Sequence, residues 1–131
     1  MKEIEVVAGI LKDTEGRILA VERGKGTWKG YWEFPGGKVE KEETSEEALK
    51  RELFEELGIT VGDFQFLTTI SYQYPEFHLT MHCFFCKIVE GEITLNEHSQ
   101  MRWLYPDELE SVDWLPADYQ IFPLIRHPKS L

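Results

Sequence analysis

One segment of the chain has the apolar spacing of an amphipathic helix. Its leucines recur at every fourth position: Leu49, Leu53 and Leu57. This spacing is the stripe that one face of a helix buries. Thr44, followed three residues later by Glu47, forms the capping box that starts a helix. Gly58 comes directly after the last leucine, where a left-handed C-terminal cap is favoured. The pattern therefore predicts a helix between Thr44 and Gly58.

Runs rich in valine, isoleucine and aromatic residues predict strands on both sides of this helix. The first two, Ile4 to Leu11 and Arg17 to Val21, are joined by Lys12 to Gly16 and indicate a hairpin. The segment Trp32 to Lys38 begins like a strand and ends in a Gly-Gly turn that leads to the helix. The strands predicted after the helix are Asp63 to Tyr74, Phe77 to Val89 and Met101 to Tyr105.

The C-terminal quarter of the chain predicts short helices. Pro106 to Glu110 has the pattern of a helical turn, and Trp114 to Asp118 leads into a final helix through about Arg126, which Pro123 would kink. No linker, repeat or low-complexity segment interrupts the sequence, so residues 1–131 are expected to form one domain. Strands and helices in this order predict an α/β fold with a mixed β-sheet between helical layers.

The composition limits the classes of partner. A formal charge of −10 argues against nucleic-acid polymers and anionic membranes, which favour a basic surface, but not against a small polyphosphate that arrives with its metal. No apolar run approaches the length of a membrane span, and the N-terminus lacks the order of a signal peptide. We therefore expect a cytoplasmic protein, monomeric by default from its size, with a dimer as the alternative.

Two cysteines lie close together in a strand-like apolar run. Cys83 and Cys86 are separated by two phenylalanines, which allows a zinc or redox interpretation. A second pair of cysteines or histidines at metal-ligand spacing is absent from the sequence. Buried, reduced cysteines are therefore the favoured prediction.

Three acidic residues near the end of the predicted helix need an explanation. Glu52, Glu55 and Glu56 share one face, where like charges repel, and they lie in the half of the helix whose dipole favours cations. A solvated acidic face is the simpler interpretation. A bound divalent cation would reverse both unfavourable terms, and the glycines before the helix would let the backbone approach a ligand. Oxygen ligands without histidine or cysteine suit Mg²⁺ or Mn²⁺ better than Zn²⁺.

These residues together resemble a complete Nudix box. The resemblance rests on Gly37, five further residues, Glu43, seven further residues, and the run Arg51-Glu52-Leu53-Phe54-Glu55-Glu56-Leu57-Gly58-Ile59. It extends in order over most of the chain and is closest to the MutT-like branch, which includes oxidised-purine nucleotide diphosphatases and cytidine triphosphate pyrophosphohydrolases. The resemblance implies a Nudix-type α/β/α sandwich and attack by water on a nucleoside triphosphate, releasing a nucleoside monophosphate and pyrophosphate.

The resemblance also implies roles for individual acidic residues. The implied metal ligands are the carboxylates of Glu52, Glu55, Glu56 and Glu97 and the carbonyl of Gly37. Glu52 is the expected general base, with Glu97 as the alternative, and a solvated loop glutamate is the simpler interpretation of Glu97. Glu43 and Arg51 are expected to form an ion pair that fixes the preceding loop against the helix.

Four further residues match substrate-binding positions of MutT-like enzymes. Arg23 matches a phosphate-binding arginine, and Lys38 is placed similarly; a solvated loop arginine is the alternative for Arg23. Phe34 and Asp118 match positions that line the base pocket, although Phe34 could be ordinary core and Asp118 an acid at a helix N-terminus. MutT has asparagine at the latter position. An ionised aspartate only accepts hydrogen bonds, whereas asparagine also donates, so this difference bears on which base is selected.

Three functions follow from these features. The first is a Mg²⁺-dependent nucleoside triphosphate pyrophosphohydrolase of the housecleaning type, such as an 8-oxo-dGTP diphosphatase. The second is a pyrophosphohydrolase of CTP, dCTP or modified pyrimidine triphosphates. The third, from another class, is a Nudix module that senses a nucleotide without cleaving it. Because every fixed position of the box is filled, an enzyme is favoured over a sensor.

Overall fold

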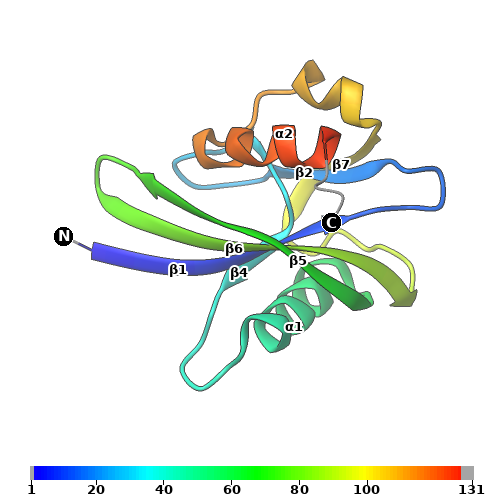
Figure 1. The fold of residues 1–131 in the computed structure, drawn as a ribbon, viewed down its shortest axis with the longest axis horizontal. Helices are drawn as coiled ribbons and strands as arrows, with labels where there is room; N and C mark the ends of the chain where they lie inside the picture. Colours follow the sequence, from blue (N-terminus) through cyan, green and yellow to red (C-terminus); the bar gives the residue numbers. More distant parts are fainter. Residues whose placement is uncertain (1, 128–131) are drawn as a thin grey trace.

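A four-stranded mixed sheet supports the helix α1 (Ser45–Leu57) in the computed structural model, which describes residues 2–127 (Figure 1). The strand order is β4 (Gly36–Lys38), β1 (Lys2–Leu11), β6 (Phe77–Glu90) and β5 (Thr60–Gln73). Strands β1 and β6 run parallel, and the other neighbours are antiparallel. The predicted α/β fold with a mixed sheet is confirmed.

A second, antiparallel sheet lies on the opposite face of the first sheet from α1 (Figure 1). Its order is β3 (Trp32–Glu33), β2 (Ile18–Arg23) and β7 (His98–Leu104). Three short helical segments, η1 (Pro106–Ser111), η2 (Pro116–Ile121) and α2 (Phe122–Arg126), lie on the side away from α1 (Figure 1). η1 contacts β7 of the second sheet, and η2 contacts β5 of the first. The helical layers therefore enclose two sheets rather than one.

Two apolar clusters fill the spaces on either side of β1, and neighbouring residues of that strand face opposite clusters. Val7 packs toward α1, where the three leucines of the helical stripe have no exposed surface: Leu49, Leu53 and Leu57. Ala8 and Ile10 pack between the two sheets. The helix begins and ends as predicted, since Thr44 forms a capping box with Glu47 and Gly58 has a φ of 70°. For α1, the structure therefore has both the ends and the buried face that the sequence pattern predicted.

The predicted hairpin is wrong. The turn between Lys12 and Gly16 exists, but β1 and β2 lie in different sheets and share only the isolated bridge between Lys12 and Ile18. β1 instead pairs with the distant strands β4 and β6. Val7 to Leu11 is buried on both faces of the sheet, so this strand takes a central position with two long-range partners rather than one adjacent partner.

The predicted Gly-Gly turn is also wrong, because Gly36 and Gly37 form strand β4 and neither has a positive φ. A Cβ atom on Gly36 would overlap the carbonyl of Val7 in β1. A Cβ atom on Gly37 would overlap the carboxylate of Glu52 in α1. The glycines are therefore required for close approach and not for a change in chain direction.

Several boundaries differ from the prediction. Strand β5 begins at Thr60 rather than Asp63, and β7 begins at His98 rather than Met101. The final helix is replaced by the 3₁₀ segment η2 and the short helix α2, and Pro123 lies in the first turn of α2, where it causes no kink. No helix within residues 2–127 is long and apolar enough to cross a membrane.

The prediction for the cysteines is confirmed. Cys83 and Cys86 are both buried and free of disulfide bonds. Burial raises the pKa of both thiols, so they remain protonated at neutral pH.

Candidate active site

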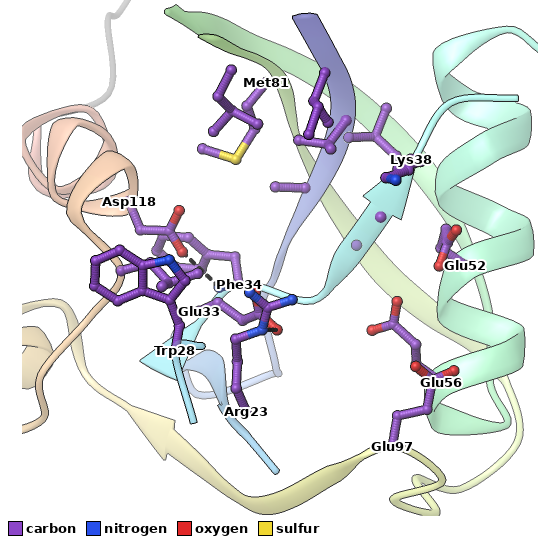
Figure 2. A pocket seen from close by; sticks show the side chains of 18 of the residues that line it. Arg23, Trp28, Glu33, Phe34, Lys38, Glu52, Glu56, Met81, Glu97 and Asp118 are labelled. Carbon is purple, nitrogen blue, oxygen red and sulfur yellow. Dashed lines mark hydrogen bonds and ion pairs between the residues drawn. The ribbon is translucent and has the colours of Figure 1, made fainter. Parts of the chain in front are cut away.

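A cavity of about 530 Å³ brings together residues from both sheets and from α1 (Figure 2). Eight of the residues predicted from the sequence line it: Arg23, Phe34, Gly37, Lys38, Glu52, Glu56, Glu97 and Asp118. Glutamates of α1 and of the loop before β7 lie at one end, and Asp118, Phe34 and Trp28 lie at the other (Figure 2). Glu43, Arg51 and Glu55 are not among the lining residues.

Glu56 is the most deeply buried of the predicted metal ligands, with an exposure of 4%. Burial raises its pKa well above the usual range of a carboxyl, and a hydrogen bond with Glu52 and the charges of Glu33 and Glu97 raise it further. Its Oε1 atom has no hydrogen-bond partner in the structure. Without a cation, Glu56 therefore carries a proton, and one of its oxygens is unpaired inside the protein.

Arg51 holds the other carboxylates of the box. Its Nε donates to Glu43 Oε2 at 2.6 Å, and its Nη1 donates to Glu52 Oε2 at 3.0 Å and to Glu55 Oε1 at 3.2 Å. Its Nη2 donates to the Lys38 carbonyl at 3.0 Å, which fastens β4 to α1. The ion pair expected between Glu43 and Arg51 is thus present, and it lowers the pKa of Glu43 to about 2.

The oxygen atoms at the acidic end suit a divalent cation, although the side chains do not form a complete coordination sphere as they stand. Across residues 2–127, no three His, Cys, Asp or Glu side chains lie together closely enough to hold a metal as they stand. Glu55 turns outward with 53% of its side chain exposed, while Glu52 and Glu56 face the cavity. The unpaired buried Oε1 of Glu56 is the kind of atom that a hard cation satisfies, and the neighbouring ligands are all oxygens.

The middle of the cavity carries positive charge. Arg23 is the exposed last residue of β2, and its Nε lies 3.7 Å from Glu33 Oε2 (Figure 2). Lys38 and Lys25 also line the cavity and are exposed. Arg23 lies between the acidic end and the aromatic end, so an elongated ligand that contacts both ends passes beside it, whereas Lys38 lies closer to α1 (Figure 2).

Asp118 lies at the aromatic end and is 4% exposed. The Phe34 backbone N–H donates to Asp118 Oδ2 at 3.1 Å. Burial raises the pKa of Asp118 well above its usual range, and the charge of Glu33 acts in the same direction, while the Phe34 hydrogen bond and Arg23 oppose it. The raised pKa favours the neutral carboxyl over the ionised acceptor considered from the sequence, and a neutral carboxyl both donates and accepts hydrogen bonds, as asparagine does.

Phe34 itself belongs mainly to the core. Its ring lies 4.5 Å from that of Trp114 between centroids, and its side chain is 3% exposed. Its contribution to the pocket is therefore the wall that it forms and the backbone N–H that holds Asp118.

Sequence reasoning missed the aromatic rim and a buried histidine. Trp28, Tyr74 and Phe77 line the cavity; Trp28 packs edge-on against Tyr74 with centroids 5.8 Å apart, and Phe77 stacks on Tyr74 at 4.9 Å. His98 and Glu33 also line it, with their side chains 3.0 Å apart. An aromatic residue in a basic loop was a possible signal for Trp28, whereas His98 and Glu33 are 65 positions apart and no local spacing relates them.

Comparison with known proteins agrees with this geometry. The family model described as the NUDIX domain matches residues 2–125. The chain is 31% identical to the 8-oxo-dGTP diphosphatase of Escherichia coli (strain K12) over 127 residues, which cover 96% of this chain and 98% of that protein. It is 35% identical to the CTP pyrophosphohydrolase of the same organism over 119 residues, which cover 90% of this chain and 87% of that protein.

A solved structure shares the fold. The crystal structure of a MutT NUDIX hydrolase from Burkholderia pseudomallei superposes with a TM-score of 0.85 and covers 94% of this chain and 98% of that chain, at 24% identity. The two-sheet arrangement with α1 on one side is therefore found in a solved Nudix structure.

Proposed function

This chain belongs to the Nudix family, with MutT-like hydrolases among its relatives, and we propose that it is a Mg²⁺-dependent pyrophosphohydrolase of modified nucleoside triphosphates. Hydrolases of this family generally need a divalent metal. The observation that carries the proposal is a single cavity with a carboxylate cluster at one end and a buried hydrogen-bonding carboxyl among aromatic residues at the other. Such a cavity suits a molecule with a polyphosphate and a base.

The metal ligands in this proposal are the five predicted from the sequence: Gly37, Glu52, Glu55, Glu56 and Glu97. When bound, Mg²⁺, or Mn²⁺ as a substitute, neutralises phosphate charge and lowers the pKa of water. Arg51 and Glu43 keep β4 and the loop after it against α1, which holds the carboxylates in register. Their role is to position the ligands.

Polar side chains along the cavity bind the phosphates and take the proton from water. Arg23 and Lys38 bind phosphate oxygens, which lie between the acidic end and the base pocket. Glu52 accepts the proton of the attacking water, and Glu97 is the alternative base, since both line the cavity. Water attack then releases a nucleoside monophosphate and pyrophosphate, with positioning and electrostatics contributing most of the rate.

Base selection rests on Asp118. As a neutral carboxyl fixed by the Phe34 N–H, it can offer one donor and one acceptor to the edge of a base. Oxidised purines, which present both kinds of group, are therefore the first choice of substrate. The second candidate is CTP, dCTP or a modified pyrimidine triphosphate, because the relative with aligned identity of 35% is named a CTP pyrophosphohydrolase.

We further propose that the enzyme acts in the cytoplasm as a monomer on free nucleotides. The charge of −10 supports small substrates that arrive with a cation over nucleic-acid polymers.

The decisive experiment is a screen of canonical, oxidised and methylated nucleoside triphosphates with Mg²⁺, in which pyrophosphate and phosphate are measured separately. We expect pyrophosphate release, with the highest kcat/KM for an oxidised purine nucleotide. Preference for CTP would establish the second candidate. Release of orthophosphate alone would contradict the cleavage position, and no hydrolysis of any nucleotide would favour the nucleotide sensor.

A further inference from the structure

His98 occupies a buried position between the two ends of the cavity. It is the first residue of β7 and pairs across the sheet with Arg23 of β2. Only 6% of its side chain is exposed. Its Nε2 atom lies 3.0 Å from Glu33 Oε2 and 3.8 Å from Glu56 Oε1. The ring thus contacts a residue beside the phosphate-binding arginine and approaches a residue of the metal site.

Two buried polar atoms at this position have no hydrogen-bond partner, one on His98 and one on Glu56. Of the buried side-chain polar atoms in residues 2–127, Glu56 Oε1 and His98 Nδ1 lack a hydrogen-bond partner. Because a carboxylate can only accept, the bond to Glu33 requires that Nε2 carry the proton. Nε2 lies 3.0 Å from Glu33 Oε2 but 3.8 Å from Glu56 Oε1, which is too far for a hydrogen bond. Glu56 Oε1 therefore has no hydrogen-bond donor.

Glu33 is the residue that His98 restrains. Its Oε2 lies 3.7 Å from Arg23 Nε as well as 3.0 Å from His98 Nε2. Its negative charge acts on two buried carboxyls at opposite ends of the cavity, Glu56 and Asp118. A change in the position of Glu33 would therefore alter both the metal end and the base end.

We propose that His98 is a positioning residue: its Nε2–H holds Glu33 beside Arg23 and away from Glu56, so that Glu56 Oε1 remains available to a divalent cation. The inference deepens the proposed function, since it assumes that Glu56 is a metal ligand. Removing the N–H releases the Glu33 carboxylate, which can then accept a hydrogen bond from the protonated Glu56, so that a cation must break this carboxyl–carboxylate pair before it binds Glu56.

The test measures Mn²⁺ binding to the nucleotide-free protein by titration calorimetry. His98→Leu keeps an apolar group of similar size and removes the donor, and we expect its Kd for Mn²⁺ to rise about tenfold. His98→Gln places an amide N–H near the position of Nε2 and should recover most of the affinity.

The matched control is His82→Leu. His82 Nε2 lies 2.7 Å from Glu5 Oε2 in a similar histidine–glutamate contact, but neither residue lines the cavity. We expect no change in Mn²⁺ affinity. If His98→Leu lowers the unfolding temperature and leaves the Kd for Mn²⁺ unchanged, the residue is merely structural and the inference is overturned.

A double-mutant cycle tests the route through Glu33. In a Glu33→Ala background there is no carboxylate to restrain, so adding His98→Leu should change the Kd for Mn²⁺ by less than about twofold. A full additional loss in that background would overturn the coupling. Because the titration uses no nucleotide, failure to hydrolyse any nucleotide would count against the proposed function and leave this result unaffected.

Discussion

Glu43 and Glu56 belong to the same acidic segment, yet their surroundings shift their pKa values in opposite directions. The Arg51 guanidinium, with help from the Glu40 backbone N–H, lowers the pKa of Glu43 to about 2. Burial, followed by the proximity of Glu52, raises the pKa of Glu56 far above the usual range. Glu43 is therefore suited to hold a cationic side chain permanently, whereas under the proposed function Glu56 would release a proton when it binds a metal ion.

Glu55 is the most exposed of the three helical carboxylates proposed to bind metal. Glu55→Gln keeps the size of the side chain but removes a charged metal ligand, and we expect turnover with Mg²⁺ to fall on the order of 100-fold or more. Circular dichroism should show an unchanged fold, because this side chain is mostly exposed. Glu46→Gln, an exposed position in the first turn of the same helix, is the control and should retain activity. Near-normal turnover of Glu55→Gln at saturating Mg²⁺ would exclude the role.

Asp118 gives a prediction about stability and pH. Its folded pKa is raised above the unfolded value near 3.8, so the unfolded chain loses this proton at a lower pH than the folded chain does. The stabilising contribution of Asp118 is therefore fully present below pH 3.8 and is lost as the pH rises above it. In that range the free energy of unfolding falls by at most about 1.4 kcal/mol per pH unit.

Asp118→Asn should remove this dependence while keeping the acceptor for the Phe34 N–H. We expect the unfolding free energies of the two proteins to differ least near pH 4 and to diverge in favour of asparagine toward pH 8, as measured by urea denaturation. Parallel profiles across this range would show that Asp118 is ionised in the folded protein.

The sequence predicted residues whose partners are local. The glutamates of α1, the capping box and the Glu43–Arg51 pair all lie within the short stretch from residue 43 to residue 58, where spacing along the chain determines most of the geometry. Glu33 and His98 could not be predicted, because only the pairing of β2 with both β3 and β7 brings them together. The ionisation state of Asp118 also depended on burial, which no spacing reveals.

The contact between β4 and α1 determines the position of the acidic end of the cavity. Gly37 lies against the Glu52 carboxylate, and Arg51 donates to the Lys38 carbonyl. The pattern predicted that glycines would permit close approach, but it assigned them to a turn. β4 is too short to show a strand pattern of its own, and its glycines resemble those of a turn.

Gly37→Ala tests this contact. The added methyl group would overlap the Glu52 carboxylate and displace it, so we expect kcat to fall about 100-fold with the fold retained. Gly62→Ala on β5 is the matched control, because its new methyl group would meet only the side chain of Val89, at 3.3 Å. Equal activities of the two variants would show that β4 has room to move.

At the scale of the whole molecule, a net charge of −10 is combined with a cavity whose acidic end is partly buried. A cation that binds there neutralises repulsion that the folded state carries and the unfolded state largely relieves. The two-sheet architecture around this cavity could not be derived from the sequence, because pairing across long separations decides which strands share a sheet.

Divalent cations should therefore raise the unfolding temperature. At a Mn²⁺ concentration of 100 times Kd, binding adds about 2.7 kcal/mol to the unfolding free energy, equivalent to roughly 10 °C for a domain of this size. Excess EDTA should reverse the shift, as followed by differential scanning calorimetry. NaCl at equal ionic strength controls for general screening, and an equal shift with NaCl would argue against a specific site.

Arg51 also determines how the protein exists before any metal arrives. Its guanidinium already contacts Glu43, Glu52 and Glu55, so the box contains a built-in counterion. These carboxylates therefore have a cationic partner in the folded chain without a metal ion, and under the proposed function a metal ion would bind to a chain that is already folded.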